Sequence, residues 1–92
     1  MLTYRRVYKL LFAKEAQKTL LRLPRDTAVL VRQKLEQLAV DPYAPNVTAR
    51  KLQGRKGYRL RIDDWRVIYE IRDDELIILV LKIAQRGDVY DE

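Results

Sequence analysis

The hydrophobic period of this chain changes once, and the change divides the sequence into a helical part and a sheet part. Before the loop at 41–46, which holds two prolines, apolar residues recur three and four positions apart. After this loop they alternate with polar residues or run without interruption. Spacing of three and four is typical of one helical face, whereas alternation is typical of a half-buried strand. The sequence therefore predicts an α+β fold.

The part before the loop predicts one strand and two helices. Tyr4 to Phe12 is rich in aromatic and β-branched residues and predicts the first strand. Pro24 ends the first helix, and Arg25 or Asp26 begins the second, with Asp26 as the expected N-cap. We expect this helical hairpin to pack on one face of the sheet. The apolar stripes are Ala13, Ala16, Leu20 and Leu23 in the first helix and Ala28, Val31, Leu35 and Leu38 in the second.

The part after the loop predicts strands joined by short connections. A short extended piece is expected at Arg50–Leu52, and strands are expected at Gly57–Ile62, Trp65–Ile71 and Leu76–Ala84. Short connections favour an antiparallel meander. The last strand is apolar on both faces, as expected of a central strand. The expectation is a single domain over residues 1–92, with an N-terminal strand, a helical hairpin and then an antiparallel sheet of three to four strands, in the order βααβββ.

The charge of the chain favours polyanionic partners. Nineteen lysines and arginines against 13 acidic residues give a net charge of +6, which suits nucleic acid or an acidic protein segment. Solubility alone is the alternative explanation of this charge. The chain has no cysteine and no histidine, so it lacks disulfides and the commonest general base and metal ligand. We expect no metal and no cofactor.

The distribution of apolar residues argues against a membrane span. The longest apolar run, Leu76–Leu81, has six residues, far fewer than the ~20 that a spanning helix needs. No apolar segment of the signal-peptide type follows the basic N-terminus. The expected location is the cytoplasm.

The register of one hairpin sorts its residues onto two faces. With Asp63–Asp64 as a two-residue loop, Arg61 lies directly opposite Arg66, and Arg59 shares their face. Like charges in that position are unfavourable, but two guanidinium forks can share one phosphate. The opposite face is apolar, with the pairs Ile62–Trp65, Leu60–Val67 and Tyr58–Tyr69.

The next turn extends this basic surface. If Asp73–Glu75 is a three-residue loop, Arg66 lies opposite Lys82, with Val67 opposite Leu81 and Tyr69 opposite Leu79. Arg86 then leaves the strand on the same side, and Tyr90 is close enough in sequence to reach back as a stacking or hydroxyl group. The alternative is a solvated basic face without a common role. The residues expected to bind RNA are Lys82 on this surface and, nearby, Lys51, Arg55 and Lys56.

Two functions suit such a face. The first is metal-independent RNA cleavage, in which the 2′-hydroxyl attacks the adjacent phosphate and arginines stabilise the developing charge; an aromatic side chain would stack on a splayed base. The second is a binding module that grips a protein or nucleic acid without chemistry. Spacing alone does not separate the two.

Four segments carry a family resemblance: Asp41–Pro45, Lys51–Gly54, Gly57–Ile71 and Arg86–Tyr90. They resemble the RelE/ParE superfamily of type II toxins, most closely its RelE branch. The resemblance implies a toxin that cleaves mRNA in the ribosomal A site and is neutralised by a cognate antitoxin. It also implies that the active site comprises Arg59, Arg61, Arg66, Arg86 and Tyr90.

The sequence departs from the RelE pattern where proton transfer is expected. The best-known RelE toxins have lysines where this chain has Arg59 and Arg61, and many relatives have a histidine where it has Gln85. Arginine is a poor general base at neutral pH, so Tyr90 or a water is the expected proton acceptor. The rival is a ParE-like toxin that binds DNA gyrase. In either branch, an acidic or amphipathic antitoxin segment is expected to cover the basic face or displace the C-terminal tail.

Overall fold

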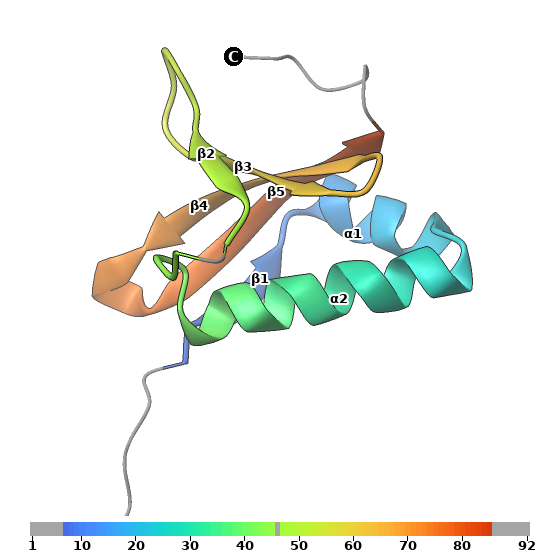
Figure 1. Cartoon of the computed structure of the whole chain (residues 1–92), viewed down its shortest axis with the longest axis horizontal. Coiled ribbons are helices and arrows are strands. Elements are labelled where there is room, and N and C mark those ends of the chain that lie inside the picture. Colours follow the sequence, from blue (N-terminus) through green and yellow to red (C-terminus); the bar gives the residue numbers. More distant parts are fainter. Residues whose placement is uncertain (1–6, 46, 86–92) are drawn as a thin grey trace, which may run out of the picture.

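The helices and strands follow the order expected from the sequence. The computed structural model describes residues 7–45 and 47–85. A strand and two helices precede four further strands and a short 3-10 turn (Figure 1). The elements are β1 (Lys9–Phe12), α1 (Lys14–Arg22), α2 (Arg25–Val40), β2 (Ala49–Lys51), β3 (Tyr58–Ile62), β4 (Trp65–Arg72), η1 (Asp73–Glu75) and β5 (Ile77–Gln85).

The five strands of residues 7–45 and 47–85 form one sheet, in the order β1-β5-β4-β3-β2. Strands β2 to β5 form the predicted antiparallel meander. β1 adds a parallel edge next to β5, so the sheet is mixed. Parallel neighbours need a long crossover, which both helices and the meander provide here. The predicted α+β fold is therefore confirmed, with β5 flanked by strands on both sides.

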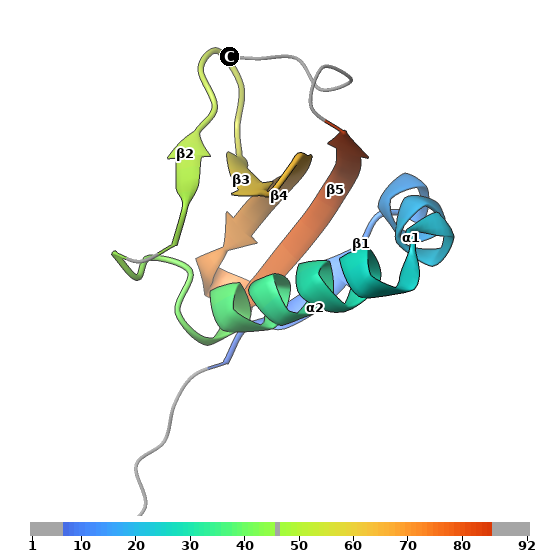
Figure 2. The same cartoon turned by 45° about the vertical axis from the view of Figure 1, so that its right-hand side comes forward.

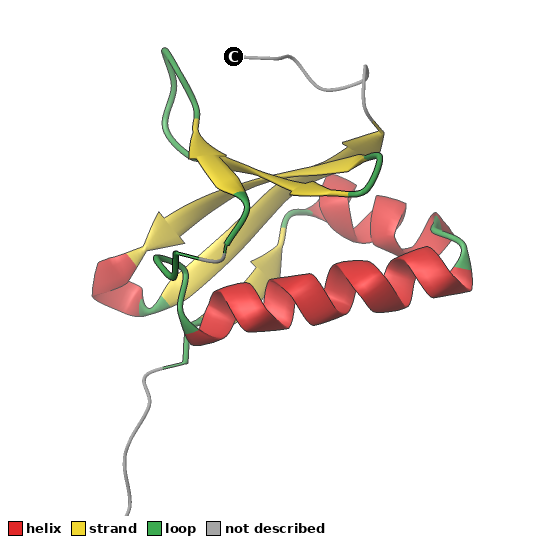
Figure 3. Ribbon diagram, viewed as in Figure 1, coloured by secondary structure: helices red, strands yellow, loops and turns green. Residues whose placement is uncertain are grey.

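Both helices lie on one side of the sheet (Figures 2 and 3), and the main core lies between the two layers. The predicted stripes supply its helical side: Ala16 and Val31 are fully buried, and Ala28 packs against the core. Neither described helix is long and apolar enough to cross a membrane. The buried sheet residues of this core are Leu60, Ile62, Val67, Tyr69, Ile78, Val80 and Ile83.

The junction between the helices corrects one prediction. Leu23 is extended, as a residue before proline should be, so α1 ends at Arg22. The N-cap of α2 is Pro24, and the predicted cap, Asp26, lies inside the first turn. Proline suits a helix start because it donates no backbone hydrogen bond. The Asp26 carboxylate still acts favourably there, because the first turn carries the positive end of the helix dipole.

The β3–β4 hairpin has the predicted register. Arg61 lies opposite Arg66, and Asp63 adopts the left-handed conformation with φ 51°. A two-residue hairpin loop needs such a φ, and aspartate tolerates it better than most residues. The apolar pairs are Tyr58–Tyr69, Leu60–Val67 and Ile62–Trp65, all as predicted.

The β4–β5 register differs from the prediction for two reasons. The connection has four residues rather than three, because Leu76 follows the 3-10 turn in a left-handed conformation with φ 54°. A bulge between Ile68 and Tyr69 then adds one more residue to β5. Together the two changes shift the pairing by two residues. Because side chains alternate between the two faces, a shift of two leaves Lys82 on the predicted face. The observed pairs are Val67–Ile83, Tyr69–Val80, Arg66–Ala84 and Ile68–Lys82.

Tyr69 lies at the centre of the core, fully buried. Its ring stacks on Tyr58 at a centroid distance of 5.6 Å. Among residues 7–45 and 47–85 its hydroxyl has no hydrogen-bond partner, and burial raises the pKa of the phenol. Stacking and burial of the ring therefore hold this residue in place without help from the hydroxyl.

The loop between β2 and β3 depends on a glycine. Gly57 has φ +118°, and a Cβ built there would lie 2.9 Å from the Tyr69 carbonyl oxygen. The Leu52 N–H donates to the Gly57 carbonyl at 2.9 Å and closes the loop. Gly54, in the same loop, has φ +72° and nothing within 4 Å of such a Cβ.

We therefore expect Gly57→Ala to lower the free energy of unfolding by about 3 kcal/mol, through backbone strain and the close contact. Gly54→Ala should cost about 1 kcal/mol, because only left-handed backbone strain applies. Urea titration followed by circular dichroism measures both. Equal losses in the two variants would show that the Gly57–Tyr69 contact imposes no constraint.

Candidate anion site on the outer sheet face

The sheet face opposite the helices carries three arginines from the β3–β4 hairpin. Leu60 and Ile62 point into the core, so Arg59 and Arg61 point to the other side by strand alternation. Arg66 joins them by pairing with Arg61. We call Arg59, Arg61, Arg66 and Lys82 the basic face.

The Arg61–Arg66 pair borders a shallow open hollow, which Asp63 and Asp64 also line. Arg66 is held in a fixed direction: its Nη1 donates to the carbonyl of Asp63 at 3.2 Å and to that of Trp65 at 3.1 Å. Arg61 is exposed. One guanidinium fixed by the turn and one exposed beside it can together bind an anion such as a phosphate.

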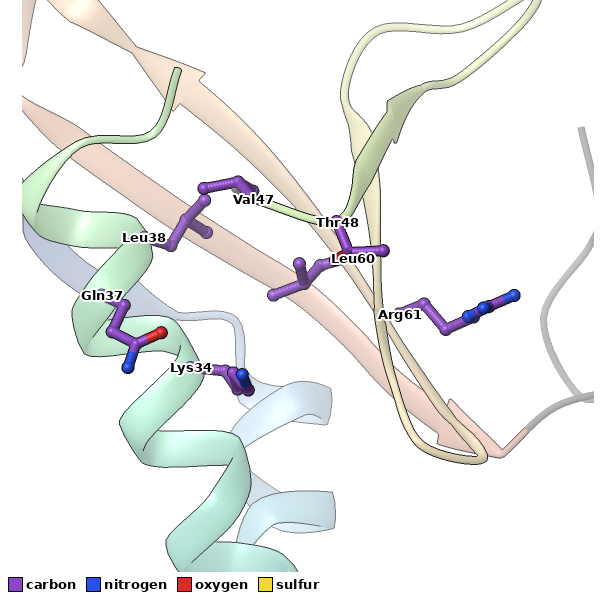
Figure 4. A pocket seen from close by; sticks show the side chains of 7 residues that line it. All are labelled: Lys34, Gln37, Leu38, Val47, Thr48, Leu60 and Arg61. Carbon is purple, nitrogen blue, oxygen red and sulfur yellow. The ribbon is translucent and has the colours of Figure 1, made fainter. Parts of the chain in front are cut away.

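Figure 4 shows how Arg61 lies relative to the helix layer. A small cleft of about 80 Å³ separates the end of α2 from β3. Leu38 and Leu60 point into it, whereas Arg61 points away from α2 (Figure 4). A cleft of this volume holds a few water molecules and no nucleotide. The accessible side of Arg61 is therefore the outer one.

Lys82 lies on the basic face, one strand away from Arg59. Ile68 separates the two, since it pairs with both Arg59 and Lys82. Its side chain is 4% exposed and packs with Leu52 and Ala84 in a small second cluster. The basic face thus has an apolar floor, which holds its central part rigid.

The three other predicted RNA-binding residues lie apart from the Arg61–Arg66 pair. Lys51 pairs with Tyr58, which packs against the helix-side core, so Lys51 belongs to the opposite side of the sheet. Lys51 and Lys56 line a pocket of about 220 Å³ together with Tyr43 and Tyr58. Arg55 is exposed in the loop between β2 and β3.

Two of the predicted active-site residues, Arg86 and Tyr90, lie outside the described residues, so their roles stay predictions. β5 ends at Gln85, opposite Trp65, one residue beyond the row that holds Arg66. Within the described part of the chain, no group of three or more acidic side chains is placed to hold a metal ion.

A polar cluster at the other end of the sheet escaped the sequence analysis. The Tyr8 hydroxyl donates to Asp73 Oδ1 at 2.6 Å, and the Tyr43 hydroxyl donates to Oδ2 at 2.7 Å. These bonds, first from Tyr8 and then from Tyr43, hold the pKa of the Asp73 carboxyl below its ordinary value. The bond to Asp73 also raises the pKa of the Tyr43 phenol. Sixty-five residues separate Tyr8 from Asp73, and no local pattern signals such a contact.

Comparison with known proteins defines the class to which this chain belongs. Residues 10–90 match the family described as the ParE toxin of type II toxin–antitoxin systems, parDE, and the chain belongs to this family. Within the wider RelE/ParE superfamily, relatives of both branches are similar to it.

Three relatives illustrate this range. A putative RelE-like toxin protein of Escherichia coli is 27% identical over 86 residues, covering 91% of this chain and 90% of the relative. The archaeal RelE–RelB complex from Pyrococcus horikoshii is 28% identical with a TM-score of 0.75, over 90% of this chain and 99% of that one. A YoeB/ParE toxin from Agrobacterium tumefaciens shares the fold at 13% identity and a TM-score of 0.73, over 85% and 98%.

The Asp73 cluster predicts a pH-dependent contribution to stability. A pKa lowered by folding means that the contribution is present above the unfolded value of ~3.9 and is lost as the pH falls through the folded value. Asp73→Asn should therefore be less stable than the unsubstituted protein at pH 7, with a difference that shrinks below about pH 4. Thermal unfolding across this pH range measures it. Asp74→Asn, which removes the same charge from the same turn, should lack this effect; identical profiles would contradict the role of the two tyrosine bonds.

Proposed function

We propose that this toxin is a ribosome-dependent mRNA endonuclease. The observation that carries the proposal is the Arg61–Arg66 pair, two guanidinium groups on adjacent strands at the edge of an open hollow. Opposed like charges are unfavourable in a sheet that only has to fold. A bound phosphate between them would turn that repulsion into attraction.

The proposed chemistry is attack of an RNA 2′-hydroxyl on the adjacent phosphate. One P–O bond forms and the bond to the 5′-oxygen of the next nucleotide breaks, leaving a 2′,3′-cyclic phosphate. Negative charge builds on the phosphorane, and guanidinium groups fixed before the reaction stabilise it without reorganisation. Arg66 suits this task because two backbone carbonyls already orient it.

Proton transfer is assigned to groups other than the basic face. Arginine is a poor proton acceptor near neutral pH, so the arginines of the β3–β4 hairpin are given no part in taking the proton. The proposed acceptor of the 2′-hydroxyl proton is Tyr90 or a water, and a water donates the proton that the leaving 5′-oxygen takes up. Slow turnover is expected of such a site, since it lacks a base with a pKa near 7.

We also propose a cognate antitoxin as partner. The Pyrococcus horikoshii relative is a complex of RelE with RelB, and the net charge of +6 on this chain suits an acidic segment. Such a segment would cover the basic face or displace the C-terminal residues, and so keep RNA from Arg61 and Arg66.

The alternative is a ParE-like toxin that binds and poisons DNA gyrase. The match of residues 10–90 to the ParE toxin family favours it. In that case the basic face would contact protein or DNA without cleaving RNA. The first function breaks mRNA and the second leads to breaks in DNA, so measuring both kinds of break separates them.

In a translating extract we expect the purified protein to produce mRNA breaks that require ribosomes, with little cleavage of naked RNA. Arg66→Ala should reduce cleavage about 10²-fold, the usual cost of removing one preorganised donor. Mapping the 3′ ends of transcripts measures both. Intact transcripts together with gyrase-linked DNA breaks would overturn the endonuclease proposal in favour of the alternative.

Arg61→Lys is expected to keep or raise the cleavage rate, because lysine, with a pKa of ~10.4, gives up its proton more readily than arginine. Arg32→Lys, a change on the exposed side of α2, is the matched control and should have no effect. Rates measured in the extract at two pH values test the expectation. A large loss in Arg61→Lys would show that the planar fork of arginine matters more than proton transfer.

A further inference from the structure

A second pair of opposed arginines lies on the outer face, beside the first. Arg50 of β2 is directly opposite Arg59 of β3. Its neighbour Ala49 pairs with Leu60 and packs against the helix-side core, so Arg50 points to the outer side by alternation. The Arg50 side chain is exposed and Arg59 is half-buried.

The two pairs are offset along the same strand. Arg59 and Arg61 are two residues apart on β3, a separation of roughly 6.8 Å in an antiparallel sheet. Arg61 is in register with Arg66 on β4, and Arg59 is in register with Arg50 on β2. The face therefore presents two double-arginine positions, which follow a diagonal from the hairpin toward the β2 edge of the sheet.

Lys82 does not belong to the second position. It is separated from Arg59 by the full width of β4, where Ile68 lies between them, and Ile68 is buried in the apolar floor. Of the two residues in register with Arg59, Arg50 on β2 and Ile68 on β4, only Arg50 carries a charge. Arg50 thus sets the direction in which the basic face continues.

We infer that the Arg50–Arg59 pair is a second phosphate subsite, which holds the phosphate next to the one at Arg61–Arg66 on a single RNA strand. The inference rests on the endonuclease proposal. One nucleotide in an extended strand spans a gap of the order of two residues along β3, so successive phosphates can reach both pairs. Arg50 is then a positioning residue: it fixes the register of the strand, and the reacting phosphate lies with Arg61 and Arg66.

A charged edge strand has another common role, protection against pairing of sheet edges between molecules. That role would make Arg50 important for keeping the protein monomeric and would leave RNA binding unaffected. The two explanations differ in what the replacement of Arg50 weakens: RNA binding under the first, and the monomeric state of the protein under the second. A binding experiment with ligands that differ by a single phosphate charge distinguishes them.

The probes are 2′-O-methyl RNA trinucleotides, which cannot be cleaved because the attacking hydroxyl is blocked. One has two phosphates, and the others carry an uncharged methylphosphonate at the first or at the second linkage. Affinities for the purified full chain are measured by NMR titration, which detects weak binding. The variants are Arg50→Ala, Arg66→Ala and, as a control of equal charge, Arg32→Ala on α2.

For the unsubstituted protein, each methylphosphonate should weaken binding about tenfold, the range expected for loss of a charge-assisted contact. Arg50→Ala should abolish the effect of one methylphosphonate position and keep that of the other, whereas Arg66→Ala should do the reverse. For the two-phosphate ligand, the logarithm of the binding constant falls linearly with the logarithm of the salt concentration. Arg50→Ala should make this slope shallower by about 0.7, which is the value for one phosphate contact to a single strand. Arg32→Ala should behave as the unsubstituted protein.

Equal behaviour of Arg50→Ala and Arg32→Ala, with Arg66→Ala still coupled to one phosphate, would overturn the second subsite and leave the endonuclease proposal standing. Self-association of Arg50→Ala in sedimentation, with unchanged RNA affinity, would assign Arg50 to edge protection instead. Failure of the unsubstituted protein to bind any trinucleotide, or indifference of binding to Arg66→Ala, would overturn both phosphate subsites, whereas the proposed function is tested separately by ribosome-dependent cleavage in the extract.

Discussion

The pairing of β3 with β4 is the constraint on which the rest of this structure depends. Because side chains alternate along a strand, one register sends Leu60 and Val67 into the core and Arg61 and Arg66 to the outer face. A slip of one residue would bury the arginines and expose the core. The free energy of hydrophobic burial therefore holds the arginines together against their repulsion. The same alternation carries the basic face onto the neighbouring strand β2.

The outer face combines rigidity with accessible charge. Ile68 and its small apolar cluster form a floor, and the carbonyls beside the hairpin turn hold the Arg66 guanidinium. Preorganisation of this kind matters most where charge develops during a reaction. The other end of the sheet is stabilised differently, by the hydrogen bonds from Tyr8 and Tyr43 to Asp73. The bonds that orient Arg66 and the tyrosine bonds to Asp73 thus lie at opposite ends of β4.

The spacing of residues predicts the structure where periodicity controls it, but not where a single backbone angle does. Helical stripes and the β3–β4 pairs follow from periods of 3.6 and 2. The β4–β5 register does not, because it depends on the left-handed Leu76 and on a bulge at Ile68 and Tyr69. Leucine is an unusual residue at positive φ, so no sequence signal marks that turn. The face of Lys82 was still predicted correctly, since a total shift of two residues leaves each side chain on the same face.

The sequence by itself determined the α+β class, the two helical stripes and the face on which Arg59, Arg61 and Arg66 lie, because these follow from local periodicity. Only the tertiary structure decided which distant strands and side chains meet. It placed β1 parallel to β5, brought Tyr8 to Asp73, and set Arg50 opposite Arg59 while it turned Lys51 to the other side. Such contacts depend on how the whole core packs, and no local pattern of residues encodes that.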